Sequence, residues 1–310
     1  MTKQRWHGGE LRQDPLSGDW TVLAPGRAGR PHGTEGLCPF CPGPGEDTPP
    51  ETWRLHDPDR DGWRVRSVPN RHPLSDRHEV IIESPRHDWD FRTATDTEAE
   101  AVLRAWQWRH LALRKNSAQV VIFRNHGAQA GCSRPHPHSQ LVGLPVLSTS
   151  ARRGLELSRD YHRGGERRYS DDQLDIALEM GTRVVLVSPH CVALAPFAPV
   201  TAFETHIVPR IARADFAVVP GTELADVARA LRRVLHALDE ELGDPAYNLV
   251  VETAPTGWEQ AAFLSWSIRI LPRLEIAAGL ELATGIPVVT TTPEHVASVL
   301  RDRISVRHRA

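Results

Sequence analysis

Two histidines separated by one residue, His136 and His138, form the segment of this chain best suited to chemistry. On an extended strand, residues two apart share a face, so both imidazoles and the amide of Gln140 would line one side of a sheet. An imidazole can attack a phosphorus centre, carry the phosphoryl group and pass it to an acceptor. The preceding turn contains Gly131 and Ser133 and can offer backbone N–H groups to an anion. The segment therefore favours phosphoryl chemistry over a pair of surface histidines.

A second chemical signal, Cys38-Pro39-Phe40-Cys41, lies much earlier in the chain. Two cysteines at this spacing commonly form half of a tetrahedral zinc site, which histidines can complete. The same spacing also occurs in redox pairs, but no thioredoxin-like strand and helix surround this one, and Pro42-Gly43 turns the chain away. We therefore expect zinc, with the remaining ligands drawn from histidines.

Composition limits the class of protein. A chain of 310 residues is long enough for one large or two medium domains with real cores. A formal net charge of -2 argues against nucleic-acid binding driven by bulk electrostatics. The sequence has no apolar run that could span a membrane and no signal-peptide pattern. Because only four cysteines are present and two of them have metal-site spacing, we expect a cytoplasmic protein.

The chain divides into two halves with the same order of elements, which we place at 1–165 and 166–310. In each half strands precede one long helix, expected over 95–114 and 222–242, and further strands follow it. The last strands match in pattern, His136-Pro-His138-Ser-Gln-Leu against Ser265-Trp-Ser267-Ile-Arg-Ile. The sequence thus predicts an α+β protein with internal duplication, whose second copy has lost both histidines.

The remaining elements follow from local patterns of apolar residues, prolines and glycines. We expect a loop over 42–58 and further helices over 152–161 and 293–303. The expected strands lie within 14–25, 78–84, 119–123, 139–146, 183–198, 205–209, 247–253 and 263–271.

Six segments, in the right order, resemble the galactose-1-phosphate uridylyltransferase family, a branch of the histidine-triad superfamily that includes nucleoside-diphosphate-sugar phosphorylases. These are 14–25, 38–43, 84–87, 125–140, 203–210 and 268–281, and the most specific is Gly-Cys-Ser-Arg-Pro-His-Pro-His-Ser-Gln. The family implies two histidine-triad-like half-barrel domains, with antiparallel sheets and long helices packed on them, paired as a homodimer. It also implies ping-pong transfer between a nucleotide sugar and a sugar phosphate through a covalent nucleotidyl-histidine.

Carried over residue by residue, the resemblance makes His138 the nucleophile and Gln140 the amide that binds the transferred phosphoryl group. It also implies a closed and therefore structural zinc site, with His72 and His78 as rivals for one histidine position. The ligands that match are Cys38, Cys41, His87 and His136.

The resemblance further implies a nucleotide pocket. The asparagines in it could equally serve turn geometry, and the arginines could be solvated surface residues. The matching residues are Asn70, Asn125, Gly131, Ser133, Arg27 and Arg30.

The chain also departs from the family pattern. A second metal site of the classical uridylyltransferases falls on Glu252, Ser265 and Ser267, and because serine is a poor ligand we expect no second metal. Glu281 matches a glutamate that binds the sugar, on a loop over 273–285 that would complete the active site of a partner subunit. The resemblance favours a hexose-1-phosphate nucleotidyltransferase of the galactose-1-phosphate uridylyltransferase type, and the alternative is a nucleoside-diphosphate-sugar phosphorylase, adenylyltransferase or hydrolase. The base, the sugar and the acceptor stay open. A zinc-stabilised nucleotide-binding protein without turnover is a third hypothesis.

Overall fold

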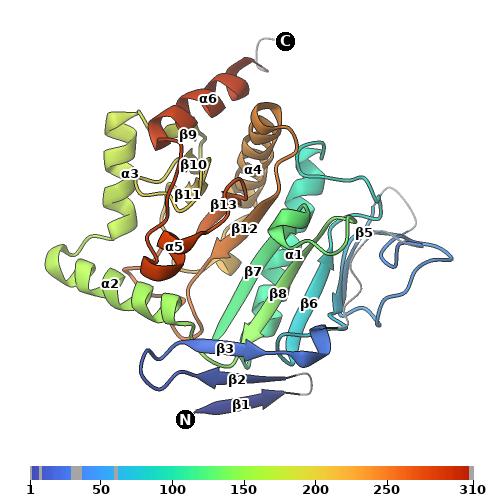
Figure 1. Cartoon of the computed structure of the whole chain (residues 1–310). Coiled ribbons are helices and arrows are strands. Elements are labelled where there is room, and N and C mark those ends of the chain that lie inside the picture. The colour runs from blue at the N-terminus through green and yellow to red at the C-terminus, as the bar shows by residue number, and fades with distance from the viewer. Residues whose placement is uncertain (1, 7–8, 29–36, 59–61, 307–310) are drawn as a thin grey trace.

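The computed structural model describes residues 2–6, 9–28, 37–58 and 62–306 (Figure 1). Within them a ten-stranded antiparallel sheet has the order β4-β5-β6-β8-β7-β12-β13-β11-β10-β9. Its strands are β4 (Trp53–His56), β5 (Trp63–Pro69), β6 (Arg77–Ile82), β7 (Gln119–His126), β8 (His138–Leu144), β9 (Val184–Val187), β10 (Cys191–Leu194), β11 (Thr205–Pro209), β12 (Tyr247–Glu252) and β13 (Ser267–Pro272).

A separate three-stranded sheet, β1-β2-β3, lies across one end of the large sheet (Figure 1). Its strands are β1 (Lys3–Trp6), β2 (Gly9–Gln13) and β3 (Trp20–Leu23). The α-helices are α1 (Asp96–Arg114), α2 (Thr149–Gly165), α3 (Tyr169–Met180), α4 (Gly221–Leu242), α5 (Gly279–Thr284) and α6 (Pro293–Val306).

The large sheet consists of two copies of one arrangement. The order β4-β5-β6-β8-β7 recurs as β9-β10-β11-β13-β12, and α1 and α4 occupy the same place in the chain order of each copy. The copies join where β7 pairs with β12, with Phe123 opposite Val250. Phe123 is also opposite Gln140, and Val250 is opposite Arg269, the two positions that the sequence match equates. The register therefore supports internal duplication about a local two-fold axis, while the domain limits at 165 and 166 stay a prediction.

Both long helices pack on the same face of the sheet. The N-terminus of α1 has a capping box, in which Thr95 and Glu98 each accept a hydrogen bond from the other's backbone N–H. From α1, the Trp106 indole N–H donates to Ser139 Oγ on β8 over 2.7 Å. Because side chains alternate along a strand, His138 and Gln140 point to the opposite face, away from the helices.

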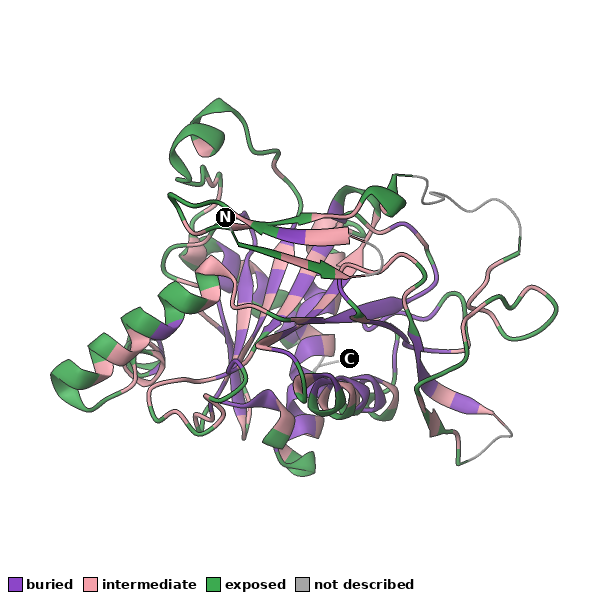
Figure 2. Cartoon of the chain, turned by 90° about the horizontal axis from the view of Figure 1, so that it is seen from below, coloured by how far each residue is buried: buried purple, intermediate pink, exposed green. Residues whose placement is uncertain are grey.

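One hydrophobic core runs through both copies. A single cluster of buried apolar residues extends from Val65 to Ile304 and includes the inner faces of α1 and α4. Figure 2 shows the buried residues concentrated along the strands of the large sheet. None of the helices in the described part of the chain is long and apolar enough to cross a membrane.

The expected α+β class and antiparallel sheet are confirmed, and the helices predicted over 95–114 and 222–242 are α1 and α4. The expected loop over 42–58 is wrong at its end, which forms the short edge strand β4. Five further elements were missed: β1, β2, β5, α3 and the short helix α5, which lies within the expected loop over 273–285. Strand β13 begins at Ser267 instead of residue 263, because turns such as that from Trp258 to Ala261 occupy the preceding segment.

A buried arginine ties the two copies together on the helix side of the sheet. Arg124 of β7 is 2% exposed and lies 3.0 Å from Glu83 and 3.2 Å from Asp90. It also donates a hydrogen bond to the Tyr247 hydroxyl on β12. Removing one member of a buried charged group leaves an uncompensated charge in the core, which costs more than the ion pair itself contributes.

We expect Glu83→Gln to lower the free energy of unfolding by roughly 3 kcal/mol, because it withdraws the carboxylate nearest to buried Arg124. A matched control is Glu100→Gln, which breaks the more exposed i,i+4 pair with Arg104 and should cost only about 0.3–0.5 kcal/mol. Urea unfolding of the two variants measures both values. Equal losses would mean that the buried group does not stabilise the junction.

Candidate functional site

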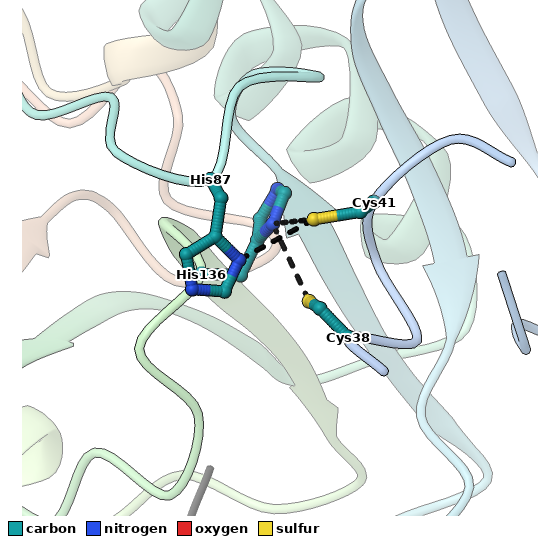
Figure 3. Close-up of side chains that lie close together, drawn as sticks. All are labelled: Cys38, Cys41, His87 and His136. Carbon is teal, nitrogen blue, oxygen red and sulfur yellow. Dashed lines mark hydrogen bonds between the residues drawn. The ribbon is translucent and has the colours of Figure 1, made fainter. Parts of the chain in front are cut away.

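Four side chains from separate parts of the chain point toward one another (Figure 3). Their potential ligand atoms all lie within 4.8 Å of one another, and within the described residues they are the one group of this kind. Nδ1 of His136 lies 3.6 Å from Sγ of Cys38 and 3.4 Å from Sγ of Cys41. Nδ1 of His87 lies 3.3 Å from Sγ of Cys41. The structure thus places His87, and neither His72 nor His78, in this group.

The donor set suits one metal ion. Nε2 of fully buried His136 lies 2.8 Å from the carbonyl oxygen of Ser84. Because a carbonyl only accepts, Nε2 carries the proton and Nδ1 presents its lone pair to the thiols. Burial lowers the pKa of His136 to about 4, which keeps the ring neutral at pH 7. Burial and the neighbouring Cys38 raise the pKa of the Cys41 thiol to about 11, so a bound cation would be needed to hold the Cys41 sulfur as a thiolate at pH 7.

The backbone of His136 sets the protonation of His138. Nδ1 of His138 lies 2.9 Å from the carbonyl oxygen of His136, so Nδ1 is the protonated nitrogen and the lone pair lies on Nε2. The ring of Phe40, from between the two cysteines, packs against both imidazoles at 5.8 and 5.7 Å between centroids. The side chain of His136 therefore belongs to the metal-ligand group, and its backbone carbonyl orients the ring of His138.

Gln140 lies on the same face of β8 as His138, and its Oε1 is held by two side chains. It lies 3.0 Å from Nε2 of His78 and 3.3 Å from Nδ2 of Asn70. Asn70 directly follows β5 and begins the turn that leads to β6. In this turn the carbonyl oxygen of His72 accepts a hydrogen bond from Arg27. Two expected nucleotide-pocket residues, Asn70 and Arg27, therefore lie beside the turn that contacts Gln140.

The loop before the histidines needs glycine. Gly127 and Gly131 have φ angles of 77° and 79°, a left-handed conformation that other residues rarely adopt. Gly131 lies beside Asn125, since a Cβ on it would be 3.9 Å from Nδ2 of Asn125. Oδ1 of Asn125 accepts a hydrogen bond of 2.9 Å from Asn248 of β12, which also donates to the carbonyl of Ala130. The second copy thus supports the loop that carries Gly131.

In the second copy an ion-pair network occupies the equivalent face. Arg269, in the place of Gln140, lies 2.9 Å from Glu204 and 3.1 Å from Glu252. Ser267, in the place of His138, donates to Glu252 over 3.2 Å. The Glu252 carboxylate therefore contacts a guanidinium and a hydroxyl, and Ser267 stands where the first copy has the imidazole of His138.

The remaining expected residues are spread more widely. Ser133 is buried in the glycine-containing loop, and Arg30 lies outside the described residues. Glu281, on the short helix α5, accepts a hydrogen bond from the backbone N–H of Ala278 in the same segment, and its contact with a sugar stays a prediction. Sequence reasoning missed Ser84 and Asn248, because only the register of the sheet brings them to the site.

Comparison with known proteins gives consistent relationships. A family model described as "Galactose-1-phosphate uridyl transferase, N-terminal domain" matches residues 73–147. An ADP-glucose phosphorylase of Arabidopsis thaliana is 28% identical over 334 residues, which are 94% of this chain and 92% of that protein. A solved uridylyltransferase structure is 28% identical with a TM-score of 0.84, covering 96% of this chain and 98% of that one. The structure of an Arabidopsis thaliana ADP-glucose phosphorylase with bound ADP-glucose is 29% identical with a TM-score of 0.77, covering 94% and 98%.

Proposed function

The chain belongs to the galactose-1-phosphate uridylyltransferase family, and on that premise we propose that it transfers a nucleotidyl group between sugar phosphates through His138. The observation that carries the proposal is the 2.9 Å contact between Nδ1 of His138 and the carbonyl of His136. This contact supports the proposal because the proton of the His138 ring lies on Nδ1, so that Nε2 has a lone pair with which it could attack phosphorus.

The reaction has two half-reactions. Nε2 of His138 attacks the α-phosphorus of a nucleotide sugar, an N–P bond forms, and the bond to the sugar-phosphate oxygen breaks. A phosphate oxygen of a hexose 1-phosphate then attacks the same phosphorus, the N–P bond breaks, and a new nucleotide sugar leaves. The His136 carbonyl keeps the Nδ1 proton and stabilises the positive charge that the ring carries in the intermediate.

The residues around His138 have supporting roles in this proposal. The Gln140 amide donates to the phosphoryl oxygens, while Asn70, Asn125 and the loop containing Gly131 and Ser133 hold the nucleotide. Arg27 and Arg30 add positive charge near the phosphates. A zinc ion on Cys38, Cys41, His87 and His136 would be structural, since four protein ligands leave no open position. Its effect on catalysis would be to hold the strand that presents His138.

A phosphorylase is the second candidate, and the similarity to the Arabidopsis ADP-glucose phosphorylase favours it. The first half-reaction would be the same. Inorganic phosphate would then attack the nucleotidyl-histidine, and a nucleoside diphosphate would leave. The two candidates differ in donor and acceptor, and they share the covalent intermediate.

One experiment separates them. The protein is incubated with UDP-glucose or with ADP-glucose, and mass spectrometry measures uridylyl and adenylyl adducts on the peptide that contains His138. The isolated adduct is then given galactose 1-phosphate or inorganic phosphate. A uridylyl adduct discharged by galactose 1-phosphate supports the transferase, and an adenylyl adduct discharged by phosphate supports the phosphorylase. Absence of any adduct would exclude both.

Removing the nucleophile should abolish the exchange of label between sugar phosphate and nucleotide sugar. We expect His138→Asn to lose the exchange and keep the wild-type melting temperature. His138→Gly should regain part of the first half-reaction with added imidazole, because the cavity left by the side chain accepts the free ring. Full exchange by His138→Asn would refute the covalent mechanism.

Metal content tests the proposed zinc site. We expect about one zinc per chain by plasma mass spectrometry, and a large loss of both zinc and thermal stability in Cys38→Ser. Cys132→Ser is the control, because Cys132 lies outside the four-residue group and should retain the metal. Two equivalents of zinc, or normal zinc content in Cys38→Ser, would contradict the assignment.

We also propose a homodimer in which the segment around Glu281 completes the partner's site. Exposed apolar side chains support an interface there: Leu274, Ile276, Leu280, Leu282, Ile286 and Val288. A Glu281 carboxylate could accept hydrogen bonds from two neighbouring sugar hydroxyls.

If Glu281 binds the acceptor sugar, Glu281→Ala should slow transfer onto hexose 1-phosphate. Adduct formation from a donor with a small leaving group should change much less. Separate rapid-quench measurements of the two half-reactions test this. Equal slowing of both would assign Glu281 a structural role, and an active monomer in sedimentation would exclude the shared site.

A further inference from the structure

His78 is a buried histidine outside the metal-ligand group, and its surroundings define its hydrogen-bonding state. It is 3% exposed and lies on β6, beside the strand that carries Gln140. The backbone N–H of Leu74 lies 3.0 Å from Nδ1 of His78. A backbone N–H can only donate, so Nδ1 must accept and the ring proton must lie on Nε2. That Nε2–H is 3.0 Å from Oε1 of Gln140 and therefore donates to it.

Asn70 repeats the same arrangement from the same turn. The backbone N–H of His72 donates to Oδ1 of Asn70 over 2.8 Å, which orients the Asn70 amide with its NH2 group toward Gln140. This NH2 group lies 3.3 Å from Oε1 of Gln140. Nδ2 of Asn70 and Nε2 of His78 are 3.2 Å apart, as two donors that share one acceptor should be. Two backbone N–H groups of the turn over 70–76 thus determine the orientation of two side chains.

An amide has two ends of opposite polarity, and only one suits an anion. With Oε1 of Gln140 occupied by two donors, its NH2 group is the end left to meet a phosphoryl oxygen. If the amide turned over, the negative oxygen of Gln140 would face the negative phosphoryl group. Accepting two hydrogen bonds at the carbonyl end also polarises the amide and strengthens its N–H groups as donors.

In the second copy, Arg269 stands in the place of Gln140 and needs no donor to orient it. His206 is opposite Arg269 as Val80 is opposite Gln140, so Glu204 stands where His78 stands. Glu204 accepts a hydrogen bond of 2.9 Å from Arg269. A guanidinium can only donate and a carboxylate can only accept, so the direction of this hydrogen bond cannot be reversed. In the first copy the equivalent pair has a reversible amide, and its direction must be imposed by a donor.

We propose that His78, in its Nε2-protonated form and assisted by Asn70, is a positioning residue that fixes the Gln140 amide with its NH2 group toward the transferred phosphoryl group. This inference rests on the proposed nucleotidyl transfer. It gives His78 a role in catalysis through Gln140 and leaves the metal site to the other four residues.

Two substitutions separate positioning from a structural role. In His78→Asn, Oδ1 replaces Nδ1 and can still accept from Leu74 N–H, but the donor to Gln140 is lost. In His78→Gln, the terminal NH2 replaces Nε2–H and can still donate to Gln140, but the Leu74 contact is lost. The rate of formation of the His138 adduct is measured in single turnovers at several donor concentrations, together with the melting temperature.

Positioning requires His78→Asn to slow adduct formation by about 10–100-fold, the usual effect of losing such a supporting contact, with little change in the half-saturating donor concentration. His78→Gln should stay within about tenfold of the wild type, since it preserves the donor. The reverse order, or full activity of both variants, would overturn the proposal. So would an active His78→Asn with a lowered melting temperature.

A second measurement does not depend on activity. Nitrogen-15 NMR of the imidazoles in the wild-type protein at neutral pH should show the proton of His78 on Nε2 and none on Nδ1. A proton on Nδ1 would overturn the proposal even if both variants lost activity. If the wild-type protein formed no His138 adduct, the proposed transfer would fail, while the NMR result would still decide whether His78 donates to Gln140.

Discussion

The site depends on His136, whose buried side chain and backbone carbonyl each make a hydrogen bond or face a potential metal-ligand atom. Its Nε2 donates to Ser84, its Nδ1 faces two thiols, and its carbonyl accepts from His138. Each contact constrains a different part of the chain: the segment just after β6, the loop with the cysteines, and the first residue of β8. Displacing His136 would therefore disturb the metal-ligand group and the protonation of His138 together, because one residue supplies both.

The large sheet consists of two copies, and only the first copy carries the histidine pair His136 and His138. The two copies share strand order and register, and they join through Phe123 and Val250 at the middle of the sheet. In the first copy the face turned away from the helices carries neutral side chains able to meet an anion, while in the second copy the same face has an arginine between two glutamates. Charge neutralisation within the second copy stabilises its face, and Asn248 from that copy still supports the loop at Asn125.

Hydrogen-bond direction is a recurring constraint in the first copy. Backbone groups can only donate or only accept, and they determine the tautomers of His136, His138 and His78 in turn. Imidazoles and amides gain a definite polarity this way without a charged neighbour. Neutral orientation suits a site whose substrates carry negative phosphates, because a carboxylate in the same place would repel them.

The sequence by itself determined the local chemistry and the long elements. The spacing of His138 and Gln140 put them on one face of β8, and the apolar periodicity of α1 and α4 predicted both helices, because these properties depend on neighbours within a few residues. The expectation that His136 shares this strand is wrong, since His136 lies in the bend just before β8. The C-x-x-C pair likewise indicated a metal site, and the family resemblance supplied His87 and His136 as its other expected ligands.

Only the tertiary structure decided which distant residues meet. The residue types and local pattern around His87, His72 and His78 do not by themselves distinguish a metal ligand from a hydrogen-bond donor; only the family resemblance of segment 84–87 favoured His87. The distinction arises because the segment that follows β6, with His87, lies beside the cysteine loop, whereas the start of β6, with His78, lies beside Gln140. Strand β4 was not predicted, because a four-residue edge strand has too few residues to show a pattern of its own. It forms by pairing with β5. Pairing across long stretches of chain depends on the whole core, which no short window of sequence contains.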